Sequence, residues 1–81
     1  MLMNRKEITD WLNETMEEKP YIHIDRKVPD HFYIPTRYQY RGIYECAGIF
    51  TVWDEVGGIA EQGFIWKPVG GGTLMYEVRD R

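Results

Sequence analysis

The residues best suited to acid–base or metal chemistry are two histidines, each close to an aspartate in the chain. His23 precedes Asp25 by two positions, and His31 directly follows Asp30. Imidazole and carboxylate groups can relay protons or bind a metal, but a metal site needs three or four converging ligands. Cys46 is the single cysteine, so no cysteine pair can complete such a set. We expect no metal and interpret both pairs as surface residues at a strand end.

Three other segments could carry chemistry, and each fits a structural role better. The Cys46 thiol shares strand parity with no histidine that could act as its base, so we expect it to be a small buried hydrophobe. The glycines at 70–72 are followed by a strand pattern, whereas a phosphate-binding loop needs a helix there. Asp54 and Glu55 are adjacent carboxylates at the tip of an expected hairpin. We therefore predict no catalytic residue and no cofactor.

The segment most suggestive of binding has the sequence RYQYR at positions 37–41. In an extended strand, Tyr38, Tyr40 and Tyr44 share one face of the sheet. Arg37 and Arg41 point the other way and lie at the rim. Tyrosine buries a large area and keeps a polar hydroxyl, which is typical of protein-binding surfaces. We predict that these five residues form a docking patch for another protein.

The same segment supports an alternative function. Arginine and tyrosine together are found on surfaces that bind single-stranded nucleic acid, where bases stack on the rings and cations hold phosphates. Residues 19–41 carry a net charge of +3, whereas the rest of the chain carries −6. The overall net charge of −3 disfavours a generally basic nucleic-acid binder, and the two residue types point to opposite faces of a strand. Nucleic-acid binding is therefore the second hypothesis.

One helix and several strands must position these residues. Residues 4–18 predict an N-terminal amphipathic helix, because Asn4 and Glu7 can form a capping box. Apolar residues then follow at helical spacing: Ile8, Trp11, Leu12 and Met16. From residue 21 onward the apolar residues alternate, which predicts strands within 21–28, 38–54, 59–67 and 73–79.

The first of these strands has one apolar and one polar face. Ile22 and Ile24 share one face, and His23 and Asp25 share the other. Arg26 falls on the apolar face, so we expect this strand to be exposed near its end.

Taken together, residues 1–81 predict a single α+β domain. Its helix packs on a strongly bent antiparallel sheet of four to five strands, which forms either a small barrel-like structure or a meander. Gly42 and Gly48 interrupt the longest strand and predict bulges or bends that let the sheet curl. An unpaired edge strand in so short a sheet can pair with the same edge of another copy, so we also expect a homodimer.

Composition limits the class of protein. The chain has 81 residues, of which 43% are hydrophobic and 15% aromatic, which suits one folded domain with a modest core. No apolar run approaches the roughly 20 residues that span a bilayer, and no secretory signal is visible, so we expect a cytoplasmic protein without a membrane segment. We predict a small non-enzymatic protein that acts through protein–protein interaction, as a regulator, an inhibitor or an assembly subunit. Its size suits an accessory or phage-type protein.

Overall fold

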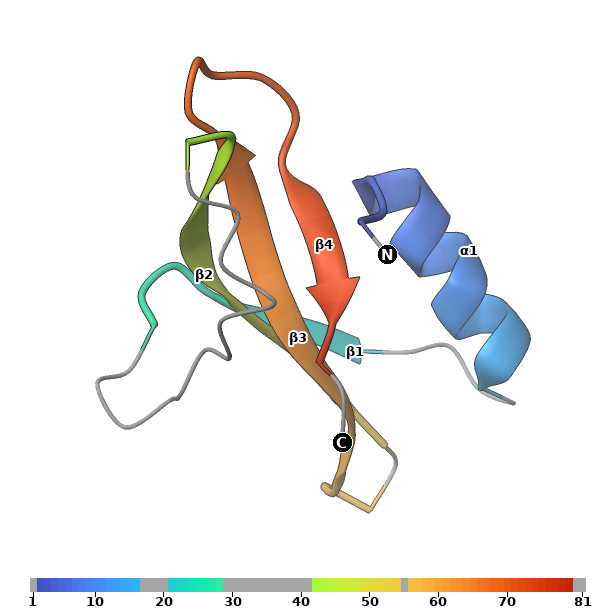
Figure 1. Ribbon diagram of the computed structural model, residues 1–81. Helices are drawn as coiled ribbons and strands as arrows, with labels where there is room; N and C mark the ends of the chain where they lie inside the picture. The colour runs from blue at the N-terminus through green and yellow to red at the C-terminus, as the bar shows by residue number, and fades with distance from the viewer. Residues whose placement is uncertain (1, 17–20, 29–41, 55, 80–81) are drawn as a thin grey trace.

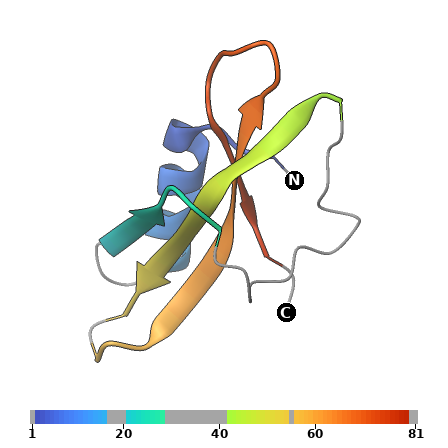
Figure 2. The ribbon, with the colours of Figure 1, turned by 90° about the vertical axis from the view of Figure 1, so that its left-hand side faces the viewer.

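One helix and four antiparallel strands make up the described part of the chain. The computed structural model describes residues 2–16, 21–28, 42–54 and 56–79. The elements are α1 (Arg5–Thr15), β1 (Tyr21–Asp25), β2 (Tyr44–Trp53), β3 (Ile59–Pro68) and β4 (Met75–Val78). The strands form one sheet in the order β1-β2-β3-β4, and α1 lies along one side of it (Figure 1; Figure 2).

The sheet confirms the predicted α+β class and the antiparallel meander, but it is not closed into a barrel. Each strand pairs with its neighbours in the chain, and β1 and β4 remain the two edges of the sheet. Closed sheets whose interior is just filled by side chains have about eight strands. The described residues provide four strands, so the barrel-like alternative is wrong and the fifth strand stays a prediction.

Helix α1 begins at the predicted capping box. The Asn4 side chain accepts a hydrogen bond from the Glu7 backbone N–H at 2.8 Å, and the Glu7 carboxylate accepts one from the Asn4 N–H at 3.2 Å. Ile8 and Leu12 are buried against the sheet. The helix ends at Thr15, before the predicted residue 18. Its last turn carries no basic side chain. The negative end of the helix dipole therefore lacks the favourable interaction with a cation that would stabilise a longer helix.

Strand β2 contains a bulge at one of the two glycines that predict bulges or bends. Gly42 lies in the turn that precedes the strand, with φ of 83°, so the chain bends there and forms no bulge within β2. Gly48 does lie at a register shift, directly after Cys46 and Ala47. A side chain at Gly48 would overlap the Asp25 carbonyl oxygen, so glycine lets the β1 backbone approach closely. The predicted strand before residue 42 lies outside the described residues.

Apolar side chains cover both faces of the sheet. On the face that packs against α1, here called the helix face, the buried cluster consists of Met3, Ile8, Leu12, Phe50, Val52, Ile65 and Tyr76. On the opposite face, here called the far face, the buried cluster consists of Ile49, Phe64 and Trp66. Three consecutive residues of β3, at positions 64, 65 and 66, are each at most 2% exposed. Strand β3 is therefore buried on both faces of the sheet at these three positions.

The segment before α1 is fixed to the outer edge of β4. The Met3 N–H donates to the Tyr76 carbonyl at 2.8 Å, and the Tyr76 N–H donates to the Met3 carbonyl at 2.6 Å. The Met3 side chain is buried with Ile8 and Leu12 in the helix-face cluster. This bridge fixes where α1 starts relative to the sheet.

Asn4→Ala removes the side-chain half of the capping box. We expect it to lower the free energy of unfolding by about 1 kcal/mol. For a domain of this size, that corresponds to a fall in melting temperature of about 4–8 °C. Asn13→Ala makes the same change at an exposed position inside α1, where alanine has the higher helix propensity, so it should not lower the melting temperature. Equal melting temperatures for the two variants, measured by circular dichroism, would contradict a stabilising cap.

Gly63→Ala tests the close packing between β3 and its neighbours. A methyl group at Gly63 would overlap the Glu77 carbonyl oxygen and lie 2.5 Å from the Phe50 ring. Overpacking of this kind costs about 1–3 kcal/mol, so we expect a clear loss of stability in chemical denaturation. Gly70→Ala is the matched control, because a methyl group there meets open space. Similar midpoints for both variants would show that the sheet relaxes around the added methyl group.

Candidate functional site

The described residues include one member of the predicted tyrosine–arginine patch. Tyr44 lies on the far face, where it is half-buried and packs against the cluster around Ile49, Phe64 and Trp66. The other four members, Arg37, Tyr38, Tyr40 and Arg41, lie outside the described residues. The patch therefore stays a prediction.

The predicted pairing of His23 with Asp25 on one face of β1 is confirmed. The His23 Nε2 atom lies 3.1 Å from the Asp25 Oδ1 atom, and both side chains are about half exposed. Across the described ranges, no three His, Cys, Asp or Glu side chains gather closely enough to hold a metal ion. His31 and Asp30 lie outside those ranges. The pair is an exposed ion pair or hydrogen bond on the far face.

Cys46 is placed as a packing residue. Its side chain contacts the far-face cluster, and its thiol donates to the Gly48 carbonyl at 3.4 Å. Burial raises the pKa of the Cys46 thiol, so less of the reactive thiolate is present at neutral pH. This environment agrees with the interpretation of Cys46 as a small hydrophobe.

The loop carboxylate and the glycine run both have structural roles. Asp54 Oδ1 accepts hydrogen bonds from the backbone N–H groups of Val56 and Gly58, at 3.1 and 2.7 Å, and so closes the predicted β2–β3 turn. Gly71 has a φ of 85°, and its N–H donates to the Pro68 carbonyl, which makes the glycine run a turn. The following element is β4, as the strand pattern predicted.

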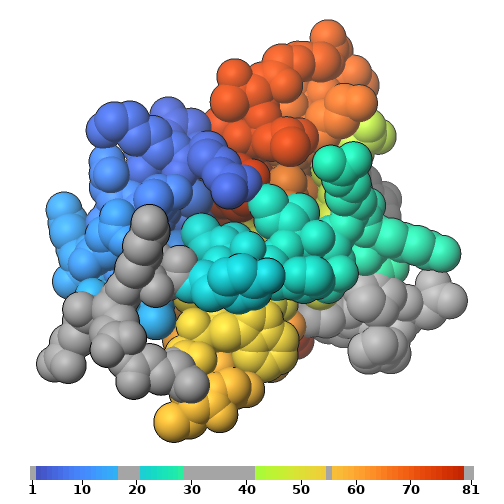
Figure 3. All heavy atoms as spheres, turned by 180° about the vertical axis from the view of Figure 1, so that it is seen from behind, coloured from blue at the N-terminus to red at the C-terminus, as the bar shows by residue number. Residues whose placement is uncertain are grey.

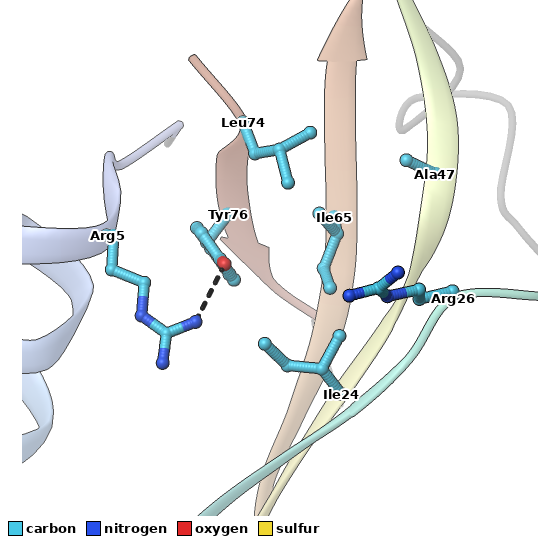
Figure 4. A pocket seen from close by; sticks show the side chains of 7 residues that line it. All are labelled: Arg5, Ile24, Arg26, Ala47, Ile65, Leu74 and Tyr76. Carbon is cyan, nitrogen blue, oxygen red and sulfur yellow. Dashed lines mark hydrogen bonds between the residues drawn. The ribbon is translucent and has the colours of Figure 1, made fainter.

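A groove of about 420 Å³ opens on the helix face, between α1 and the sheet. All four strands or their flanking residues contribute to it, as does the first residue of α1 (Figure 4). Four aliphatic side chains form its apolar part: Ile24, Ala47, Ile65 and Leu74. Arg5, Arg26 and Tyr76 supply its polar groups.

Arg5 is held at the groove by its contact with Tyr76. Its Nη1 atom donates to the Tyr76 hydroxyl at 3.2 Å, and its guanidinium carbon lies 5.9 Å from the centre of the Tyr76 ring. Tyr76 is itself fixed by the backbone bridge to Met3 and is only 4% exposed. The guanidinium is therefore attached to a rigid part of the core, although the Arg5 side chain is exposed.

Arg26 reaches the groove from the opposite side. It directly follows β1, and its side chain points toward Ile65 (Figure 4). Its position among apolar neighbours is visible in the sequence, where Arg26 shares the face of Ile22 and Ile24. The sequence does not reveal that Arg5 lies opposite, because the two arginines are on different elements.

The charge in the groove is positive, although the chain as a whole carries −3. No acidic residue is among those that line it, and no ion pair joins Arg5 or Arg26 to a carboxylate in the described part of the chain. The N-terminal end of α1 adds the positive end of a helix dipole beside Arg5.

This arrangement can bind an anionic group above an apolar surface. Guanidinium groups bind carboxylate or phosphate through two parallel hydrogen bonds, and they remain protonated at any physiological pH. The aliphatic part of the groove suits an alkyl side chain.

No helix of the described residues is both long and apolar enough to cross a membrane. Comparison of the chain with protein-family models, with curated proteins and with solved structures gave no match.

Proposed function

We propose that this protein is a non-catalytic binding module that holds an acidic segment of a partner protein in the groove on its helix face. The observation that carries this proposal is the pair of arginines, Arg5 and Arg26, which line one groove with four aliphatic side chains, while its described lining residues include no carboxylate. A partner segment with an acidic residue next to an aliphatic one would satisfy both parts of the groove. The module would act as a regulator, an inhibitor or an assembly subunit.

The groove chemistry favours binding over catalysis. The polar side chains among its described lining residues are two guanidiniums and one tyrosine hydroxyl, which already accepts a hydrogen bond from Arg5. Guanidinium groups cannot serve as a general base, because they do not lose their proton. We place this activity in the cytoplasm, where the Cys46 thiol would stay reduced.

The groove also favours a protein partner over nucleic acid. Proteins that bind single strands present aromatic rings on which bases stack. Among the described residues that line the groove, Tyr76 alone carries a ring; it is 4% exposed and packs edge-to-face with Phe50, so it offers no free face to a base. The alternative function, single-stranded nucleic-acid binding, depends on the 37–41 segment instead, and the test below includes it.

The proposal predicts that a labelled peptide of alternating aspartate and leucine binds the protein and that Arg5→Gln/Arg26→Gln weakens this binding at least tenfold. A hydrogen bond to a charged group contributes about 1.5–3 kcal/mol, so the loss of two guanidinium groups exceeds a tenfold change. Fluorescence anisotropy measures the affinities, and circular dichroism checks that the double variant is folded.

Two controls separate groove recognition from general attraction of charges. Lys27→Gln/Lys67→Gln removes the same charge at two exposed positions that do not line the groove, and it should leave the affinity nearly unchanged. A peptide with lysine in place of aspartate should not bind. The groove proposal is wrong if both double variants lose affinity equally. Tighter binding of single-stranded oligothymidine, unaffected by the arginine changes, would support the nucleic-acid alternative.

A further inference from the structure

The two edges of the sheet differ in how they are covered. On the outer edge of β4, the Tyr76 N–H and carbonyl groups are both bonded to Met3. On the outer edge of β1, no backbone hydrogen bond joins any of its five residues to another described segment. The atoms of β1 lie at the surface in the view of Figure 3. β1 is therefore the edge that can accept another strand.

The composition of β1 does not block such pairing. Natural edge strands often carry a proline, a bulge or a lysine that prevents association. The sequence of β1, YIHID, contains none of these, and its five residues pair with β2 without a register shift. Ile22 and Ile24 are half-buried at the border of the helix-face cluster, so an added strand could cover more of their surface.

We propose that two copies of this chain pair through β1, as antiparallel strands related by a two-fold axis at His23. The four-stranded sheets would then join into one continuous sheet of eight strands, with both copies of α1 on the same side. A two-fold axis perpendicular to the sheet places the helix faces of both copies on the same side of the joined sheet.

The register follows from the length and parity of β1. Residues directly opposite each other in antiparallel strands point to the same face, so odd-numbered residues of β1 pair with odd, and even with even. Centring on Ile22 or Ile24 would leave part of each strand without a partner from β1. Only the His23-centred register pairs all five residues of both copies.

The side chains are compatible in this register. Ile22 of each copy lies opposite Ile24 of the second copy, which extends the apolar row of the helix face. Tyr21 lies opposite Asp25 of the second copy, so the phenol hydroxyl can donate to a carboxylate. His23 of one copy lies opposite His23 of the second copy. No two groups of fixed like charge face each other.

The contact is short, so the dimer is expected to be weak and to dissociate on dilution. Sedimentation equilibrium of the unchanged chain should show a mass that rises from 9.7 kDa toward twice that value as concentration increases. His23→Lys would place two ammonium groups opposite each other and should weaken the dimer at least tenfold. Thr73→Lys adds a lysine in an exposed loop away from β1 and should leave dimerisation unchanged.

Disulfide trapping tests the register directly. Opposed residues of antiparallel strands have Cα atoms about 4.5–5.5 Å apart, which is within the range that a disulfide can bridge. In a Cys46→Ala background, His23→Cys should cross-link to itself under mild oxidation, whereas Asp25→Cys alone should not. A mixture of the Tyr21→Cys and Asp25→Cys variants should form the heterodimer.

Three results would overturn the proposal. The first is a chain that stays at 9.7 kDa up to millimolar concentration. The second is a dimer that His23→Lys leaves intact but that Arg5→Gln/Arg26→Gln abolishes, because the interface would then be at the groove. The third is cross-linking of Asp25→Cys to itself in preference to His23→Cys, because the strands would then pair in another register. Circular dichroism of each variant shows whether a lost dimer reflects a lost fold.

Discussion

Burial of the sheet on both faces is the constraint on which the rest of the structure depends. Phe64 and Trp66 point to the far face, while Ile65 between them points to the helix face, and none of the three is more than 2% exposed. In a chain of 81 residues, each remaining element must help to cover one face or the other. Helix α1 covers the helix face with Ile8 and Leu12, and its position leaves the groove beside its first turn.

Tyr76 connects this packing to the groove chemistry. Its ring belongs to the helix-face cluster, its backbone pairs with Met3, and its hydroxyl accepts a hydrogen bond from Arg5. A cation beside the positive end of a helix dipole is unfavourable by itself, and the contact with Tyr76 partly offsets that penalty. A buried residue therefore holds one of the two guanidinium groups of the positive groove, although the net charge of the chain is negative.

The sequence predicted local features well, because short-range chemistry determines them. The capping box of Asn4 and Glu7, the bulge at Gly48 and the shared face of His23 and Asp25 each depend on neighbours within a few positions. The end of α1 and the start of β2 were misjudged, because strand and helix patterns continue in the sequence beyond the point where packing supports them. The sequence left open whether the sheet is barrel-like or an open meander, since a glycine can signal a bend without fixing how far the bend goes.

The groove could be predicted only in part. The parity of β1 placed Arg26 on an apolar face, but Arg5 comes from α1. The two elements are brought together by the bridge between Met3 and Tyr76 and by the packing of α1 on the sheet. No local pattern encodes contacts between positions so far apart in the chain.

The bridge between Met3 and Tyr76 also has a consequence for biosynthesis. An isolated helix as short as α1 is marginal in water, so α1 gains lasting support only after Tyr76 has emerged from the ribosome. The helix face is therefore completed only after β4 has been synthesised, with β1, β2 and β3 free to assemble first.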